Sequence, residues 1–339
     1  MTETILVTGA TGFLAKHVIE ALLKNEYAVR GTLRDLSKAA AVQATLAANH
    51  IPHLDRLSFV ALDLTQDAGW DDAMRGIDAV MSVAAPVFVN GETATSTMTT
   101  AATDGTLRLL KAADRADIRR MIMTANLGAV AFSQFDRSRP TTEVDWTDPE
   151  QVSLSAYERS KLIAEQAAWD FAKTSGGRLQ LTTINPGAML GPSLDDHVSG
   201  SFGIVANLFD TPLIPNVPMH LVDVRDVADL HVKALQNDAA IGARFIAVTD
   251  AAITMPQMAA VIRENRPTLA KRLSKRTLPG WLIRAAGHFN QQAKQGALFL
   301  RIQPEIANQH AKTVLSWRPR SNQEAILAAV DSLQKAGKL

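Results

Sequence analysis

A glycine-rich turn near the N-terminus constrains the fold of this chain more than any other feature. Residues 8–15 read Thr-Gly-Ala-Thr-Gly-Phe-Leu-Ala, between the β-branched run Ile5–Thr8 and a helical pattern. Gly9 permits a tight turn, Gly12 lets another group approach the backbone closely, and Ala15 is small enough for the helix to pack on the strand. A strand, a glycine turn and a helix in this order predict the first half of a β-α-β unit.

Strand-like and helical patterns alternate from this turn to Ile184. Short β-branched runs predict strands at Ile5–Thr8, Ala28–Leu33, Ser58–Leu62, Ala79–Val83, Arg120–Thr124 and Gln180–Ile184. Longer periodic segments predict helices at Phe13–Lys24, Ser37–Ala48, Ala68–Arg75, Thr93–Ala116 and Leu154–Thr174. This alternation requires right-handed crossovers between parallel strands, with helices on both faces of the sheet. The expected fold class is therefore α/β, a doubly wound parallel sheet of the Rossmann type.

The rest of the chain is less regular and predicts a smaller, mostly helical C-terminal lobe. Gly187–Pro218 is rich in Gly, Pro and Asp, which favours loops and short helices lying over the sheet. Asp223 is expected to cap a helix, with Asp226 completing a capping box, and Gly242–Val248 is expected to add a strand. The expected sheet domain is 1–187 and 222–248, and the expected C-terminal lobe is 188–221 and 249–339.

Composition narrows the range of partners. The 339 residues include 35 Lys and Arg against 34 Asp and Glu, so we do not expect nucleic acid as a partner. The absence of cysteine excludes disulfides, thiolate catalysis and zinc sites built on sulfur, and the eight histidines show no metal-binding spacing, so we expect no metal. We recognise no targeting segment and no run long enough to span a membrane. These features predict a cytoplasmic protein, monomer or homodimer, with no membrane partner.

One basic segment lies in the C-terminal part. Seven basic residues face a single acid, Glu264, between Arg263 and Arg284. A charge run of this kind is usually a solvated helix and loop, and an anion or phosphate patch is the alternative.

The glycine turn also predicts a nucleotide site. Free N–H groups at the start of a helix and the helix dipole attract a phosphate. We therefore expect cofactor contacts from the residues of the turn, Gly9, Thr11, Gly12, Phe13 and Leu14.

Two cations follow the second predicted strand and bear on the choice of cofactor. Enzymes that bind NAD usually carry an acid at this strand tip, whereas an Arg accommodates the 2′-phosphate of NADP. Both types occur here, as Arg34 and Asp35, and strand alternation places Arg34 at the tip. Lys38 adds a second cation one helical turn later. The sequence therefore predicts NADP(H), with an ordinary solvated strand end as the alternative.

Tyr157 and Lys161 are four residues apart on a predicted helix and share one face. A tyrosine that donates its proton near neutral pH needs a lowered pKa, which an adjacent ammonium provides. The other tyrosine, Tyr27, lies between the first helix and the second strand, away from the carboxyl ends of the strands. Tyr157 opens the helix after the fifth strand, near the crevice where such sheets bind ligands. We expect Tyr157 and Lys161 to be catalytic, and ordinary helix-surface residues are the alternative.

Further motifs accompany these residues in a fixed order. They are Thr8–Ala15, Leu33–Asp35, Asp63-Leu64, Val-Ala-Ala-Pro at 83–86, Asp-Gly-Thr at 104–106, Tyr157 with Lys161, Asn-Pro-Gly at 185–187, Val222–Asp226 and Trp-Arg-Pro at 317–319. As an ordered set, they resemble the extended short-chain dehydrogenase/reductase family. Within it, they are similar to the dihydroflavonol reductase-like branch, which includes cinnamoyl-CoA reductases and microbial aldehyde and ketone reductases. The resemblance covers nearly the whole chain.

The resemblance implies an NADPH-dependent oxidoreductase that reduces an aldehyde or ketone to an alcohol. Tyr157 would protonate the oxygen of this small-molecule carbonyl substrate while the nicotinamide delivers a hydride. The implied cofactor contacts come from several strand ends. They are Asp63 and Leu64 near the adenine, Ala84, Ala85, Pro86, Tyr157 and Lys161 near the nicotinamide ribose, Thr124 at the end of the fifth strand, and Pro186, Gly187, Ala188 and Met189 near the carboxamide.

The chain departs from the family's pattern at two positions. Asn126 stands where the family has a catalytic serine, and Ser82 stands where the branch usually has histidine. An amide N–H can donate to a developing oxyanion, so we expect Asn126 to polarise the carbonyl, with Thr124 as its fallback. The alternative is that Asn126 only closes the turn by bonding to nearby backbone.

Two other functions use the same fold. A non-catalytic NADP-binding sensor would keep the nucleotide site, but such sensors typically lack the Tyr-Lys pair that this chain retains. A nucleotide-sugar epimerase or dehydratase usually favours NAD, and dehydratases add an acid pair after the fifth strand that this chain lacks. The sequence therefore favours the carbonyl reductase.

Overall fold

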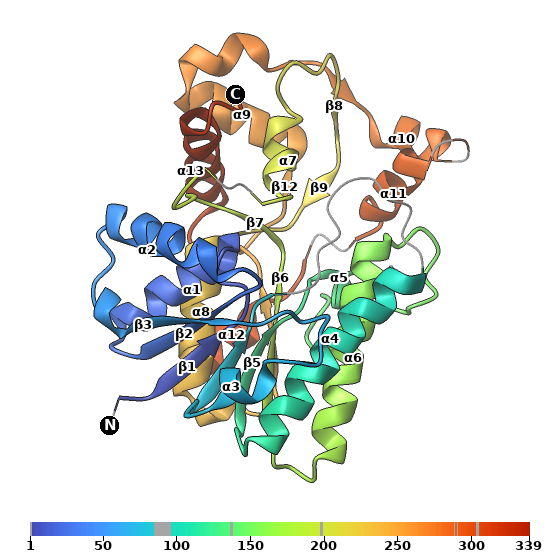
Figure 1. The fold of residues 1–339 in the computed structure, drawn as a ribbon. Helices are drawn as coiled ribbons and strands as arrows, with labels where there is room; N and C mark the ends of the chain where they lie inside the picture. The colour runs from blue at the N-terminus through green and yellow to red at the C-terminus, as the bar shows by residue number, and fades with distance from the viewer. Residues whose placement is uncertain are drawn as a thin grey trace.

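A computed structural model describes residues 2–84, 96–135, 138–196, 199–287, 289, 291–302 and 305–339. Within these residues, seven parallel strands form one sheet in the order β11-β6-β5-β4-β1-β2-β3 (Figure 1). The strands are β1 (Thr4–Val7), β2 (Ala28–Leu33), β3 (Leu57–Ala61), β4 (Ala79–Ser82), β5 (Arg120–Thr124), β6 (Gln180–Pro186) and β11 (Arg244–Ala247). The strand order reverses between β1 and β4, which is where sheets of this type bind ligands. The expected doubly wound parallel sheet is confirmed.

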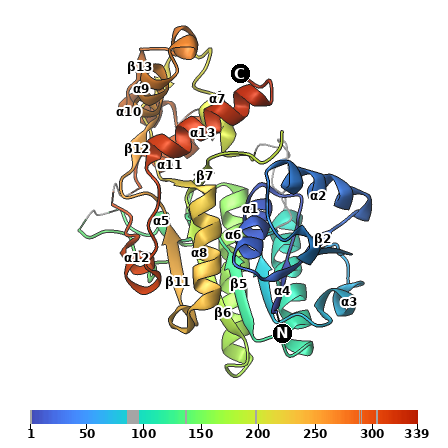
Figure 2. The same ribbon diagram turned by 90° about the vertical axis from the view of Figure 1, so that its left-hand side faces the viewer.

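Helices cover both faces of the sheet, as Figures 1 and 2 show. One face carries α1 (Phe13–Lys24), α2 (Ala39–Ala48), α8 (Val224–Gln236) and α12 (Gln309–Leu315). The other carries α3 (Trp70–Met74), α4 (Ser96–Arg115) and α6 (Ala156–Thr174). Side chains alternate along each strand, so Ile5 packs toward α1 and α8 while Leu6 packs toward α3, α4 and α6. Because helices cover both faces, most residues of the central strands are buried, including polar ones such as Thr124 and Thr183.

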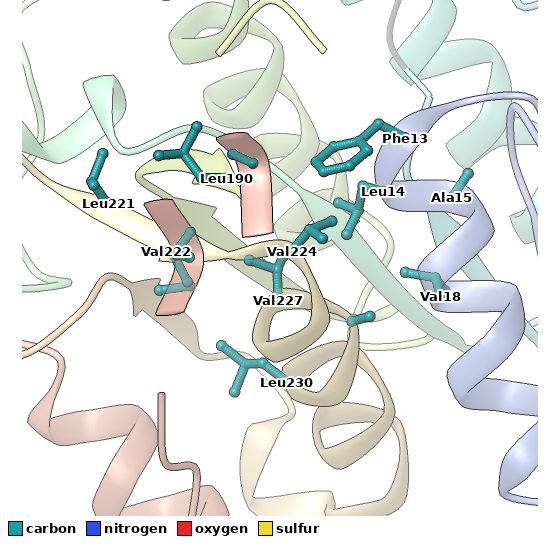
Figure 3. Close-up of a cluster of buried hydrophobic side chains, with 14 of the residues drawn as sticks. Phe13, Leu14, Ala15, Val18, Leu190, Leu221, Val222, Val224, Val227 and Leu230 are labelled. Carbon is teal, nitrogen blue, oxygen red and sulfur yellow. The ribbon is translucent and has the colours of Figure 1, made fainter. Parts of the chain in front are cut away.

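The core between α1 and α8 anchors the start of α1. Phe13, Leu14 and Val18 of α1 lie beside Val224 and Val227 of α8 (Figure 3). All five side chains are at most 6% exposed. This packing fixes the N-terminus of α1 over the carboxyl ends of the central strands.

The remaining elements form a mostly helical lobe above these strand ends, as expected (Figure 1). Its strands are β7 (Ala188–Leu190), β8 (Ile214–Pro215), β9 (Pro218–Met219), β10 (Leu221–Asp223), β12 (Ile253–Thr254) and β13 (Thr277–Leu278). Its helices are α7 (Phe202–Ala206), α9 (Met255–Asn265), α10 (Gly280–Ala286), α11 (Gln291–Phe299) and α13 (Asn322–Lys335). The lobe also contains the short helix η4 (Pro267–Arg272), and short helical segments elsewhere are α5 (Gly128–Ala131), η1 (Leu36–Lys38), η2 (Leu54–Arg56) and η3 (Asp238–Ala240).

The loop after β7 links the two parts of the molecule. The buried ammonium of Lys16 on α1 pairs with Asp195 of this loop. Asn49, which follows α2, donates to the carbonyl of Leu194 at 2.7 Å. On the other side, the N–H of Ser193 donates to the hydroxyl of Ser332 on α13 at 2.9 Å. The loop therefore holds α1, α2 and α13 together.

Two helix starts show how local and distant partners compete. Helix α6 begins at Ala156 and not at Leu154, because Ser155 and Glu158 form a capping box that sets the first turn. Asp223 caps α8 as expected and accepts from the N–H of Arg225. The expected capping box with Asp226 is wrong. Its carboxylate instead accepts from the backbone N–H and the guanidinium of Arg320.

Three of the seven basic residues in the segment from Arg263 to Arg284 have partners within the protein. Arg266 pairs with Asp331 at 2.6 Å, Arg272 pairs with Asp210, and Arg263 donates to the carbonyl of Ser274 at 2.9 Å. These contacts support the solvated helix and loop. Of the helices that the structure describes, none is long and apolar enough to cross a membrane.

Candidate active site

The glycine turn joins β1 to α1 at the carboxyl edge of the sheet. Gly9 has a φ of +70°, and a Cβ on it would lie 2.7 Å from the Cβ of Ala84, so only glycine fits. The hydroxyl of Thr8 accepts from the N–H groups of Val83 and Ala84 at 3.0 and 2.8 Å, which fixes the end of β4 beside the turn. The loop from β4 is thus tied to the side chain of Thr8, at the start of the turn.

The N-terminus of α1 opens onto this turn. Its N-cap, Gly12, provides no side-chain cap, and its first turn carries no acid, so the positive end of the helix dipole is not neutralised by its own helix. The side chains of Phe13 and Leu14 are buried, which leaves their backbone amides as the groups that can bind a ligand. Thr11 is exposed and Gly12 is half-buried. The turn therefore has the features of a phosphate cradle.

The tip of β2 presents cations to solvent. Arg34 and Lys38 are exposed. The carboxylate of Asp35 accepts from the N–H of Ser37 at 2.9 Å, so this acid caps a short helix. At the end of β3, the half-buried Asp63 accepts from the N–H and hydroxyl of Thr65, which together with the nearby Arg34 lowers its pKa. Leu64 beside it is half-buried.

The expected nicotinamide side is partly described. Ala84 is half-buried, while Ala85 and Pro86 lie outside the described residues. Pro186 ends β6, and its carbonyl accepts from the N–H of Leu127 at 2.9 Å. A Cβ on Gly187 would collide with the carbonyl oxygen of His220, so the chain passes close to β10 at this point. Gly187, Ala188 and Met189 are half-buried.

Asn126 lies next to Tyr157. The amide oxygen of Asn126 accepts from the N–H of Gly128 at 2.7 Å, so the amide closes the turn after β5. This bond fixes the orientation of the amide, because only its oxygen can accept an N–H. The Nδ2 group is left for the hydroxyl of Tyr157, with which Asn126 forms a side-chain hydrogen bond. The oxygen of the Asn126 amide therefore closes the turn, and its nitrogen contacts Tyr157 in the site.

The pKa of Tyr157 differs from the sequence expectation. Its side chain is 49% exposed overall, but burial of the hydroxyl end raises the pKa above its ordinary value, and the bond with Asn126 partly offsets this rise. Glu158 raises the pKa further. The expectation that Lys161 lowers the pKa of Tyr157 is wrong in this structure, where Asn126 is the group with that effect. Tyr157 is thus fully protonated at neutral pH.

Lys161 lies one turn further along α6 and is 8% exposed. Burial lowers the pKa of its ammonium from 10.5 to about 8, and the carboxylate of Glu165 opposes the shift. The structure therefore places Tyr157, Asn126 and Lys161 at the carboxyl ends of β5 and β6.

Thr124 does not share this site through its side chain. Its hydroxyl bonds to Nε2 of His231 at 2.8 Å, on the face of the sheet covered by α8. Burial lowers the pKa of His231 to about 4, so the ring is neutral. The expected fallback of Thr124 for Asn126 is therefore wrong, because β5 turns its hydroxyl into the core. A cofactor contact of Thr124 stays a prediction for its backbone alone.

Sequence reasoning missed the buried charges behind the site. Glu165 is 0% exposed and pairs with Arg244 at 3.0 Å. Glu165 had a local signal in the sequence, because it lies four residues after Lys161 on the same helix face. The guanidinium of Arg244 stacks 3.6 Å from the ring of Trp146 and had no local signal. Within the ranges that the structure describes, no cluster of His, Cys, Asp and Glu has a metal-site arrangement.

Comparisons with known proteins agree with this geometry. A family model described as the NAD dependent epimerase/dehydratase family matches residues 5–247. A cinnamoyl-CoA reductase of Medicago truncatula is 28% identical over 79% of this chain and 82% of its own length. An anthocyanidin reductase of Vitis vinifera is 30% identical over 78% and 81%. The solved structure of yeast methylglyoxal/isovaleraldehyde reductase complexed with NADPH is 26% identical and has a TM-score of 0.81, covering 99% of this chain and 100% of that chain.

Proposed function

The chain belongs to the NAD dependent epimerase/dehydratase family, and we propose that it works there as an NADPH-dependent reductase of aldehydes or ketones. One observation carries the proposal: Asn126 bonds to the hydroxyl of Tyr157 on the helix that buries Lys161, at the same edge of the sheet as the glycine turn. The similar plant proteins named above are reductases, and the similar yeast reductase was solved with NADPH. All three are consistent with carbonyl reduction.

The residues present fit NADPH. Gly12 has no side chain, which lets a pyrophosphate approach the backbone at the start of α1, where the first amides of the helix are free to bind it. Arg34 and Lys38 are exposed cations for the 2′-phosphate, while Asp35 is engaged by Ser37 and does not select a ribose hydroxyl. We assign the remaining contacts to Thr11, Asp63, Leu64, Ala84, Ala85, Pro86, Thr124, Lys161 and residues 186–189.

The chemistry follows from the protonation states of the site. When bound, NADPH supplies the hydride for the carbonyl carbon. The Nδ2 group of Asn126 donates to the carbonyl oxygen, and the protonated hydroxyl of Tyr157 gives that oxygen its proton. The Nδ2 group of Asn126, which lowers the pKa of Tyr157, stabilises the resulting phenolate, and the ammonium of Lys161 holds the ribose. The phenolate then takes up a proton from solvent, which restores the hydroxyl of Tyr157.

We place the substrate between this site and the C-terminal lobe. In this arrangement residues 1–187 and 222–248 hold the dinucleotide, and residues 188–221 and 249–339 shape the substrate side. The partner is a small carbonyl compound, and the protein acts in the cytoplasm as a monomer or homodimer.

The test is oxidation of NADPH by the purified chain against a panel of aldehydes, diketones and dihydroflavonols. We expect turnover with at least one class and a preference for NADPH over NADH. Tight NADPH binding without turnover on any carbonyl would favour a sensor. Turnover of a nucleotide sugar would favour an epimerase or dehydratase.

A further inference from the structure

A buried carboxylate lies one helical turn beyond Lys161. Glu165 is 0% exposed, and three side chains from two other elements donate to it. Its Oε1 accepts from the hydroxyl of Thr183 at 2.7 Å and from Nε of Arg244 at 3.0 Å. Its Oε2 accepts from Nδ2 of Asn185 at 2.8 Å. The carboxylate is therefore held in one orientation between α6, β6 and β11.

Asn185 extends this network to the active site. The same Nδ2 group that donates to Glu165 also donates to the backbone carbonyl of Asn126 at 3.1 Å. The Oδ1 of Asn185 finds no donor among the described residues, so its two acceptors alone orient the amide. Glu165 thus fixes the side chain of Asn185, which in turn binds the backbone carbonyl of Asn126. This backbone belongs to the turn that directs Nδ2 of Asn126 toward Tyr157.

Glu165 also compensates charge. Lys161 and Arg244 are each 8% exposed, and an unpaired buried cation is costly to keep charged. The carboxylate is bound to Arg244 and keeps the pKa of Lys161 from falling below about 8. Without it, Lys161 would lose the carboxylate that opposes the lowering of its pKa, and Arg244 would lose its ion-pair partner at 3.0 Å.

Other charged groups around α6 do not take this role. Arg108, Asp114 and Arg115 of α4 pair with residues elsewhere, and Asp104 and Lys111 are exposed. On the segment that covers β11, Glu143 accepts from the N–H of Ile246 at 3.2 Å and Asp145 pairs with Arg139. On α6 itself, Glu158 is bound to Ser155 in the capping box. Glu165 is the carboxylate, within the described residues, whose charge acts on Lys161.

We propose that Glu165 is a positioning residue that serves both halves of the site, fixing the Asn126 turn through Asn185 and keeping the Lys161 ammonium charged. The inference deepens the proposed reductase and rests on it, because it assigns a task to Lys161 and Asn126. Glu165 itself touches neither substrate nor cofactor. Its effect is expected in the pH range over which Lys161 can act.

The experiment is the pH dependence of NADPH binding, followed by fluorescence titration between pH 6 and 10. In the wild type, affinity is expected to fall as pH rises through about 8, where Lys161 loses its proton. In Glu165→Gln, which keeps the size of the side chain, the fall should begin at least about one pH unit lower. At pH 8 the wild type then keeps about half of its low-pH affinity and the variant about a tenth.

Two matched variants separate charge from shape. Glu165→Asp shortens the side chain but keeps the charge, so its binding profile should stay close to that of the wild type. Glu143→Gln removes another partly buried carboxylate that contacts β11, and it should lower thermal stability without moving the profile. If Glu165→Gln does not fold, the wild-type fall near pH 8 and the Glu165→Asp profile still decide the matter.

The proposal is overturned by a wild-type affinity that stays flat between pH 7 and 9, or by a Glu165→Gln profile that coincides with the wild type. It is also overturned if Glu143→Gln shifts the profile as far as Glu165→Gln does. These outcomes are read from binding alone. A wild type that binds NADPH and reduces no carbonyl would instead contradict the proposed function, and the binding profiles would still test Glu165.

Discussion

Near the ends of β5 and β6, a buried titratable group is kept neutral on one face of the sheet and charged on the other. On the α8 face, His231 is fully buried between the hydroxyl of Thr124 and the carbonyl of Val227, and its ring is kept neutral by a pKa of about 4. On the α6 face, Lys161 is almost as buried but has a carboxylate within range and keeps a pKa of about 8. The same strands therefore support a neutral core on one side and a charge on the other.

The difference shows what a helix must supply to keep a charge buried. Helix α8 offers His231 a backbone carbonyl, which satisfies a ring N–H but adds no counter-charge. Helix α6 offers Lys161 the carboxylate of Glu165, which is itself bound by Arg244. A charged group is costly to bury unless it is paired, so the paired charge marks the face where chemistry is expected.

The largest effect is expected from Tyr157→Phe, which tests whether the α6 face carries the proton donor. The change keeps the ring and removes the proton donor, so kcat should fall by about 10²–10⁴ while NADPH still binds. The measurement is steady-state NADPH oxidation on the best carbonyl substrate, with fluorescence titration for binding. Near-normal turnover would show that the α6 face does not carry the acid.

Asn126→Ala should have the next largest effect. Removing an oxyanion donor typically costs about 10²–10³ in kcat, and the loss of the bond to Gly128 should also lower thermal stability. Asn126→Ser restores a small donor and should retain most of the activity. A stability loss with kcat intact in Asn126→Ala would leave the amide with only its turn-closing role.

Lys161→Met should stabilise the protein while weakening NADPH binding. Below pH 8 the buried ammonium is charged in the folded state at a pKa of about 8 against 10.5 when unfolded, so the unfolded chain holds the proton more tightly. That difference corresponds to a penalty of about 3 kcal/mol at pH 7, which fades as pH rises toward 10.5. Urea unfolding at pH 7 and pH 10 tests both parts. A less stable variant at pH 7 would contradict the reading of Lys161 as a strained charge.

His231 should produce a smaller and purely structural effect. Its folded pKa of about 4 lies below the ordinary 6.5, so its contribution is complete above pH 6.5 and is lost as pH falls through about 4. The expected loss is about 3 kcal/mol between those limits, and less over the range where the protein stays folded. In His231→Gln this part of the acid dependence should disappear, with kcat at pH 7 unchanged. Equal acid dependence in both proteins would show that His231 is not kept neutral by the core.

The sequence predicted well what depends on local pattern. The glycine turn, the strand alternation and the ordered motifs led to the doubly wound sheet and to the family, and the structure and the family match confirm both. Tyr157 and Lys161 share a helix face because four residues make about one turn, which spacing alone reveals. Their roles, and those of Asn126 and the cofactor-binding residues, remain predictions.

What failed depends on partners far along the chain. Asp226 has the spacing of a capping box, but Arg320, 94 residues later, takes its carboxylate. Glu165 reads as an ordinary helix-surface acid until the fold brings Arg244, 79 residues later, against it. The alternation that suggested Thr124 as a neighbour of Asn126 ends with β5 at Thr124, so the next residues follow the turn and not the pleat. The partners Arg320 and Arg244 lie outside any local window of sequence, and the spacing from Lys161 is the one local signal for Glu165.

The loop after β7 limits how this chain can be recombined with its relatives. A chimera that keeps α1 but takes its C-terminal lobe from another reductase would lose Asp195 unless the donor supplies a carboxylate at that place. Lys16 would then be a buried cation without its partner, and breaking a buried pair in this way typically costs about 3–5 kcal/mol. A crossover placed before β7 also replaces Leu194, the partner of Asn49, and Ser193, the partner of Ser332. Exchanging lobes to change substrate range is thus constrained by a junction remote from the reacting groups.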